Sequence, residues 1–522
     1  MNLKLIDIAN SRYIWFILPV LVVIAPVILF GHPGYYGDDF NMLESLEDNQ
    51  GIWGAVKNWI ENYGYTYRPI GALFLYTIYG LFASNATVMY AISLVTYSCF
   101  IYVLFRESLL LSKDKSLSIF LVIFFSFFPF NPTAFLQLSS LYMMFTGLLT
   151  MLVLGKIIDK SRNFSFQESV LFSSLWLMLL FSYEQITGLI AVIFLLVFLT
   201  NIDKGTKESF KKSFIVCFGI GFTTLVFFIV FVSSPGNPKM QTVKDLNQKT
   251  SITINAESDN NKEAKGQYVF KPAETNTIVD GRVNAIISKI DRGTAFLLAN
   301  FSYSYHALVN NGWRGTLLFL ILFVAILPIC FISIVPPTKY QAASYVIVGL
   351  IWFSSTLAPF FLYKSVHIPP YVLLIPSIGM GVMVYGLYWL LWNGKMKKTS
   401  IAVFKIALLF LVISFPIQQY GYYFGLKEEL NFWQAISTPF KKVEADFLQG
   451  KIIELTNIND KKNTHIFWIE KLVGYRYFLN LTDKNSSQLS VIYNSQNKSV
   501  TIIPEKTTGE IVVKNLKNNI YK

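Results

Sequence analysis

Two adjacent carboxylates, Asp38 and Asp39, stand in the run Gly37-Asp38-Asp39-Phe40, directly after a hydrophobic segment. Neighbouring carboxylates repel each other, which favours a proton or a cation shared at such a site. A pair of this kind can act as a general base with a helper, or it can bind a divalent metal ion. The structural alternative is that Asp38 or Asp39 caps a helix beginning near Phe40.

Four further ionisable residues stand at the ends of apolar segments: Arg68, Glu184, Lys364 and His367. Arg68 either binds a phosphate through two parallel hydrogen bonds or extends to the membrane interface. Glu184 lies in an apolar hairpin, where it is either a solvated turn residue or a buried acid that requires a partner. Lys364 and His367 share a short loop and could face an anionic head group; for His367 an interfacial structural role is the alternative.

Composition identifies the class of protein. The chain has 522 residues, of which 53% are hydrophobic and 14% are charged, whereas soluble domains are about 25% charged. It is therefore predicted to be a polytopic α-helical membrane protein. The net charge of +13 comes from short basic runs between apolar segments, so no nucleic-acid partner is predicted. The three cysteines lie in apolar segments and suggest neither a disulfide framework nor a metal cluster.

Eleven apolar segments are predicted to be transmembrane helices in the lipid bilayer. They are 13–31, 84–105, 117–130, 138–155, 169–183, 186–200, 213–232, 315–335, 341–361, 371–392 and 401–424. The stretch Pro69–Ala83 is predicted to be a re-entrant or interfacial helix that leads into the second span, with a separate short span as the alternative.

The basic residues orient these spans. Lys and Arg gather at the N-terminus and in runs that alternate with turns holding only Lys364. The runs are 106–115, 156–162, 204–212, Lys339 and 395–398. By the positive-inside rule the N-terminus is cytoplasmic and the C-terminus is extracytoplasmic. The predicted location is the cytoplasmic (inner) membrane.

This topology divides the chain into a transmembrane domain, 1–425, and an extracytoplasmic domain, 426–522. The first domain carries an acidic outer loop, 32–68, and a long outer loop, 233–292. The second domain is predicted to be a small α/β domain. Its helical stretch is Glu428–Leu448, and its β-like runs are 464–469, 499–503 and 510–513.

The order of these features resembles the GT-C superfamily of integral-membrane glycosyltransferases, which use polyprenyl-phosphate sugars. The resemblance rests on the anchor span, the outer loop that opens with Asp38-Asp39, Arg68-Pro69 at the next membrane entry, and the long loop after the seventh span. It covers roughly residues 1 to 300. The eleven-span layout is similar to protein O-mannosyltransferases, and the outer tail resembles bacterial glucosyltransferases that modify O-antigen of lipopolysaccharide.

The resemblance implies that Asp38 is the base that deprotonates the acceptor hydroxyl. Many members carry an Arg-Tyr pair followed by prolines where this chain has His367-Ile368-Pro369-Pro370, so His replaces Arg there. Arg68, Lys364 and His367 are then the expected cations for the donor phosphate. Asp39 or Glu184 would orient the acceptor or hold a metal; a divalent metal is thus a candidate cofactor, and no other cofactor is expected.

The sequence thus predicts an inverting hexosyltransferase. Short cytoplasmic loops leave no room for a nucleotide-binding domain, so an activated sugar outside the membrane must arrive on a lipid. The acceptor would be a hydroxyl of a surface glycan such as O-antigen, another lipid-linked glycan, or a protein. The alternatives are a transporter or flippase, a glycan polymerase or ligase of a surface-polysaccharide pathway, and a non-catalytic membrane scaffold.

Overall fold

The computed structural model describes most of the helical part of the chain and a small sheet. The described residues are 13–32, 34, 39, 42–43, 45–46, 49–61, 68–82, 84–127, 136, 138–233, 312–361, 373–392, 397–443, 446, 449–456, 490–494, 499–503 and 508–515.

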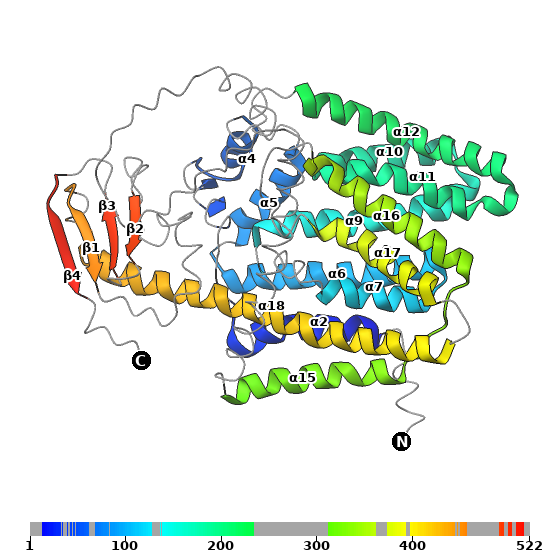
Figure 1. Ribbon diagram of the computed structural model, residues 1–522. Coiled ribbons are helices and arrows are strands. Elements are labelled where there is room, and N and C mark those ends of the chain that lie inside the picture. The colour runs from blue at the N-terminus through cyan, green and yellow to red at the C-terminus, as the bar shows by residue number, and fades with distance from the viewer. Residues whose placement is uncertain are drawn as a thin grey trace, which may run out of the picture.

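A bundle of apolar helices forms the body of the protein (Figure 1). Within the described residues, six helices are long and apolar enough to cross a membrane. They are α6 (Ala86–Ser112), α9 (Leu141–Lys160, with the flanking 3-10 turns η1 Leu138–Ser140 and η2 Ser161–Asn163), α12 (Thr206–Ser233), α15 (Gly312–Phe331), α16 (Lys339–Phe361) and α17 (Leu374–Trp392). The chain is therefore an integral membrane protein with several spans.

Shorter apolar helices fill the rest of the bundle. They are α2 (Ile14–Phe30), α5 (Pro69–Phe82), α7 (Lys115–Phe127), α10 (Phe166–Leu180), and the 3-10 turn η3 (Glu184–Gly188) followed by α11 (Leu189–Thr200). Every predicted apolar segment coincides with a helix, which confirms the helical assignment. The eleven crossings themselves stay a prediction. A further short helix, α4 (Ile52–Glu61), lies in the first loop.

The longest helix, α18 (Lys397–Lys441), leads from the bundle to the sheet (Figure 1). Its 45 residues would extend about 68 Å at 1.5 Å per residue, more than twice the hydrocarbon thickness of a bilayer. The predicted span 401–424 and the predicted helical stretch from Glu428 are thus parts of one continuous helix. Position 425, where the sequence suggested a domain boundary, lies inside it.

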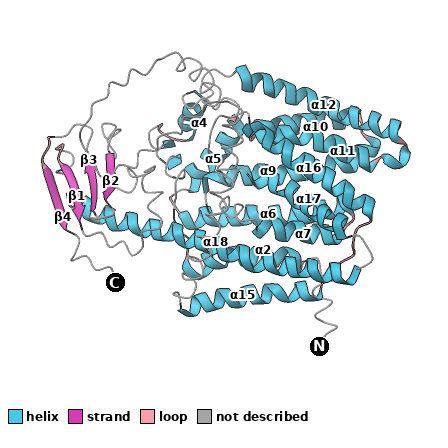
Figure 2. Cartoon of the chain, viewed as in Figure 1, coloured by secondary structure: helices cyan, strands magenta, loops and turns pink. Residues whose placement is uncertain are grey.

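Beyond α18 the described strands form one mixed sheet (Figure 2). The strands are β1 (Ile452–Thr456), β2 (Ser490–Asn494), β3 (Ser499–Ile503) and β4 (Ile511–Asn515), in the order β2-β3-β1-β4. Strand β1 pairs antiparallel with β3 and parallel with β4. The predicted strands at 499–503 and 510–513 are confirmed, whereas β1 and β2 were not predicted and 464–469 lies outside the described residues.

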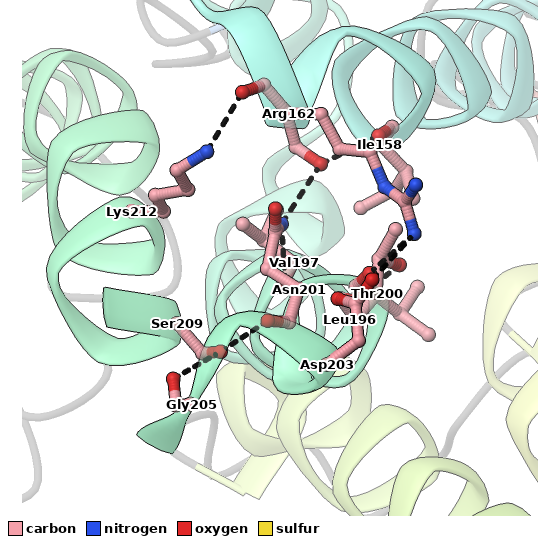
Figure 3. Close-up of polar contacts among 11 residues, drawn as sticks. Ile158, Arg162, Leu196, Val197, Thr200, Asn201, Asp203, Gly205, Ser209 and Lys212 are labelled. Carbon is pink, nitrogen blue, oxygen red and sulfur yellow. Dashed lines mark hydrogen bonds and ion pairs between the residues drawn. The ribbon is translucent and has the colours of Figure 1, made fainter. Parts of the chain in front are cut away.

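At the end of the bundle opposite the sheet, a polar cluster joins helices α9, α11 and α12 (Figure 3). The amide of buried Asn201 donates to Ser161 Oγ at 3.3 Å, and Ser209 Oγ donates to the Asn201 carbonyl at 2.5 Å. Lys212 Nζ donates to the Arg162 carbonyl at 2.7 Å. Helices α11 and α12 turn back here over the five residues 201–205, which include the 3-10 turn η4 (Ile202–Lys204).

This arrangement predicts that two residues of similar exposure are accessible from opposite sides of the membrane. Ile202 in η4 is 51% exposed, and Val513 in β4 is 58% exposed. In a background without the three native cysteines, Ile202→Cys and Val513→Cys should react with a membrane-impermeant maleimide from opposite sides of the membrane. Labelling of intact cells or spheroplasts, compared with permeabilised ones, measures this. Labelling of both residues from the same side would contradict the arrangement.

Candidate functional site

The centre of the candidate site is a buried ion pair between Arg68 and Glu184. Arg68 immediately precedes α5, and Glu184 is the first residue of η3. Arg68 Nε donates to Glu184 Oε2 at 2.6 Å, and its Nη2 donates to Oε1 of the same carboxylate. The exposed fractions of the two side chains are 9% and 3%. The contact is therefore a bidentate, desolvated pair between residues that are 116 positions apart.

Two tyrosines complete the surroundings of this pair. The remaining guanidinium nitrogen, Nη1, donates to Tyr142 OH at 2.9 Å. The carbon of the guanidinium lies 5.2 Å from the centroid of the Tyr183 ring. All three nitrogens of Arg68 are thus engaged, and the positive charge also contacts an aromatic face. Any phosphate that approached Arg68 would meet a cation already neutralised by Glu184.

Two glycines allow the elements that carry the pair to approach closely. A Cβ on Gly71, one turn after Arg68, would lie 2.7 Å from the carbonyl oxygen of Ser182. A Cβ on Gly188, at the end of η3, would lie 2.1 Å from the carbonyl oxygen of Ser355 in α16. Because both contacts are with backbone atoms, neither can be relieved by a rotamer change. The absence of a side chain therefore lets α5 approach the Ser182 carbonyl and lets η3 approach the Ser355 carbonyl of α16.

The second part of the site is the carboxylate of Asp39, which is completely buried. Its Oδ1 accepts a hydrogen bond from Tyr79 OH at 2.8 Å and from the backbone N–H of Ser139 at 2.6 Å. Ser139 lies in η1, directly before α9, so the negative charge lies at the N-terminal end of that helix. Asp39 thus interacts with the start of a helix far away in sequence.

One short segment, 138–142, joins the two parts. Its Ser139 N–H contacts Asp39, and its Tyr142 hydroxyl contacts Arg68. Tyr90 OH in α6 adds a further link, because its oxygen lies 2.9 Å from the Gly34 carbonyl oxygen and 2.8 Å from that of Leu136, and it can donate its one proton to either. Helices α5 and α6 and the 3-10 turn η1 before α9 therefore all contact the connection between α2 and α4, at Gly34 or Asp39.

The structure brings together some of the predicted residues and does not describe others. Arg68 and Glu184 are in direct contact, and Glu184 is buried rather than a solvated turn residue. Asp39 lies at the same end of the bundle, whereas Asp38, Lys364 and His367 lie outside the described residues. Within the described part of the chain no group of three or more His, Cys, Asp or Glu could hold a metal ion. The described residues therefore supply no group of further ligands for a metal ion bound at Asp38 and Asp39.

Sequence reasoning missed four residues of the site: Tyr79, Ser139, Tyr142 and Tyr183. Their types gave little signal, because tyrosines are abundant in this chain and are common at membrane interfaces. The i, i+3 spacing of Tyr76 and Tyr79 places both on one face of α5, and both contact the first loop, at Ser45 and Asp39.

No protein-family model matches the chain, and no curated protein matches it either.

The ion pair predicts strongly unequal costs for single and double substitutions. Glu184→Ala leaves a buried, uncompensated guanidinium and should lower the free energy of unfolding by about 3–5 kcal/mol. The double variant Arg68→Met/Glu184→Leu removes both charges and should be markedly more stable than the single variant. Denaturant titration of the purified protein in detergent measures both. As a control, Glu61→Ala removes an exposed partner of Lys57 and should cost less than about 1 kcal/mol. A single variant as stable as this control would contradict the burial of the pair.

The close approach of α5 predicts a contrast between two glycines of the same helix. Gly71→Ala should destabilise the protein by about 1–3 kcal/mol, because the new methyl group meets the fixed Ser182 carbonyl. Gly80→Ala is the matched control: its new methyl group would overlap Cγ1 of Ile52 at 2.5 Å and Cδ1 at 2.8 Å, and these side-chain atoms can move, whereas a backbone carbonyl cannot. Thermal unfolding in detergent should rank Gly71→Ala well below Gly80→Ala. Equal melting temperatures would contradict the proposed packing.

Proposed function

We propose that this protein is an inverting membrane glycosyltransferase that moves one sugar from a polyprenyl-phosphate donor to a hydroxyl acceptor outside the membrane. The observation that carries the proposal is the burial of Asp39 between Tyr79 and the start of α9. This contact holds the acidic loop at the end of the bundle where Arg68 and Glu184 also lie. Asp38 directly precedes Asp39 in the sequence, and we infer that the anchored Asp39 positions it as a general base.

The reaction assigns one role to each acid. Asp38 accepts the proton of the acceptor hydroxyl as its oxygen attacks the anomeric carbon of the sugar. The bond from that carbon to the lipid phosphate breaks, and the phosphate leaves with the electron pair. The products are a glycoside of inverted configuration and a polyprenyl phosphate. Asp39 acts as a positioning residue for Asp38, and Lys364 and His367 remain the proposed cations for the leaving phosphate.

The connections at the far end of the bundle support a lipid-linked donor. The described turns there are 113–114, 161–165, 201–205 and 332–338, none longer than seven residues. In the proposed orientation this end faces the cytoplasm, with eleven spans and the sheet outside. Turns of this length leave no space for a nucleotide-binding domain, so we infer that the sugar reaches the site on a lipid. A surface glycan such as O-antigen is the proposed acceptor class.

The position of the charges distinguishes the proposal from its main competitor. A transporter or flippase carries ionisable groups near the middle of the membrane. Here Asp39 is a helical residue in the connection between α2 and α4, Arg68 directly precedes α5, and Glu184 lies in the turn between α10 and α11. Ionisable residues at the ends of helices favour a reaction at the membrane surface over transport of a substrate through the membrane.

The test is a transfer assay with purified protein, a glycan acceptor and either a polyprenyl-phosphate sugar or a nucleotide sugar. We expect transfer only from the lipid-linked donor. Asp38→Asn should lower the rate by at least about a hundredfold, the lower range for loss of a general base, with unchanged thermal stability. Asp39→Asn should reduce the rate less and should lower stability, because its buried contacts weaken.

Two controls sharpen this assay. Glu61→Gln changes an exposed acid of the same loop region and should leave the rate unchanged. Addition of a chelator separates a metal-assisted reaction from a metal-free one. Transfer from the nucleotide sugar alone, or full activity of Asp38→Asn, would overturn the proposal.

A further inference from the structure

A second cationic site lies on the sheet side of the bundle, where α2, α15 and α18 run side by side (Figure 1). Lys427 of α18 donates from Nζ to the carbonyl of Phe30, the last residue of α2. The guanidinium carbon of Arg314, near the start of α15, lies 5.8 Å from the centroid of the Phe30 ring. Both cations therefore contact the same residue at the end of α2.

These two charges are close to each other and lack a carboxylate partner among the described residues. Lys427 is half-buried and lies beyond the predicted span 401–424. Burial first, and then the charge of Arg314, lower the pKa of Lys427 below its usual range. The described contacts of Arg314 are with the rings of Phe30 and Trp313 and include no ion pair with a described residue. The repulsion between two such cations is relieved when an anion binds between them.

The donors of this cluster match a phosphate group. An ammonium has three N–H donors, and Lys427 uses one of them for the Phe30 carbonyl. The guanidinium of Arg314 donates no hydrogen bond to a described residue, so its planar fork can hold two phosphate oxygens.

His32 lies next to the cluster. Burial and the charge of Lys427 lower the pKa of His32, which favours the neutral ring. Its Nδ1 accepts from the Gly34 N–H at 3.2 Å, so Nε2 carries the proton.

The surroundings indicate that the phosphate belongs to a lipid. Arg314 is exposed, and the adjacent Trp313 is 69% exposed, as is typical of a residue at a membrane interface. Below it, α15 presents a continuous apolar stripe formed by Leu320, Val324 and Leu327, which are 54%, 51% and 40% exposed. A ligand that combines a phosphate with a hydrocarbon chain can contact the cations and this stripe at once.

We propose that Arg314 and Lys427 bind the phosphate of a membrane lipid whose hydrocarbon chain lies along the exposed stripe of α15. The inference stands on these contacts and does not require the proposed glycosyltransferase activity. The ring of His32 stacks on Tyr90, with 5.4 Å between centroids, and Tyr90 also contacts the segment that leads to Ser139 and Asp39. A lipid bound here therefore lies beside the acidic loop, and it is either a phospholipid of the bilayer or a polyprenyl phosphate.

The test is lipid binding by the purified full-length protein in detergent, measured by native mass spectrometry or by microscale thermophoresis. The probes are phosphatidylglycerol, undecaprenyl phosphate, phosphatidylcholine as a lipid without net charge, and inorganic phosphate. The double variant Arg314→Gln/Lys427→Met should bind the anionic lipids at least about tenfold more weakly than the wild type. Arg314→Lys keeps the charge but loses the planar fork, and should show an intermediate loss.

A control with the same loss of charge is Lys57→Gln/Lys442→Gln, two exposed lysines outside the cluster. It should bind lipid like the wild type. Since Lys427 also contacts the end of α2, Arg314→Gln alone serves as the variant least disruptive to folding, and thermal unfolding verifies that it is intact.

The pattern of probes identifies the source of the phosphate. Loss of phosphatidylglycerol binding in the variants indicates a phospholipid site, and selective loss of undecaprenyl phosphate binding indicates a polyprenyl site. Either result supports the proposal whether or not the transfer assay succeeds. Equal lipid binding by wild type, variant and control would overturn it, as would binding of inorganic phosphate with no preference for a lipid.

Discussion

The buried ion pair between Arg68 and Glu184 is the interaction on which the arrangement of this end of the protein depends. A desolvated carboxylate or guanidinium alone would be strongly unfavourable in so apolar a bundle, so each requires the other. Their contact specifies how α5 lies against the turn between α10 and α11. Gly71 and Gly188 make that contact sterically feasible, because backbone atoms of neighbouring elements occupy the space of a side chain.

The acidic loop depends on this arrangement through the start of α9. Tyr142 hydrogen-bonds to Arg68, and Ser139, less than one turn earlier, hydrogen-bonds to Asp39. Tyr79 approaches the same carboxylate from α5. A polar group buried among apolar helices thus has its hydrogen bonds satisfied by residues from several parts of the chain. Such cross-linking anchors Asp39 to helix α5 and to the start of α9.

The two ends of the bundle differ in how they hold their basic residues. At the far end, Arg162 of η2 contacts the Thr200 carbonyl and forms an ion pair with Asp203, and Lys212 of α12 donates to the Arg162 carbonyl (Figure 3). At the sheet end, Arg68 is neutralised by Glu184, whereas Arg314 and Lys427 share the end of α2 without a described carboxylate partner. An anion that approached the sheet end would therefore meet uncompensated charge at Arg314 and Lys427 but not at Arg68.

Hydropathy determined from the sequence alone that this is a helical membrane protein, because each span must bury a continuous apolar stretch in the bilayer. Asp38-Asp39, Arg68 and Glu184 also stood out, since charges are rare in such a chain. The sequence did not indicate that Arg68 and Glu184 form a pair, because they are 116 positions apart and no local pattern links them. Only the tertiary structure decided that Glu184 neutralises Arg68 and that Asp39 contacts the start of α9. The same holds for α18, where the span and the helical stretch after it look separate in composition but form one helix that continues through Pro416, Gly421 and Gly425.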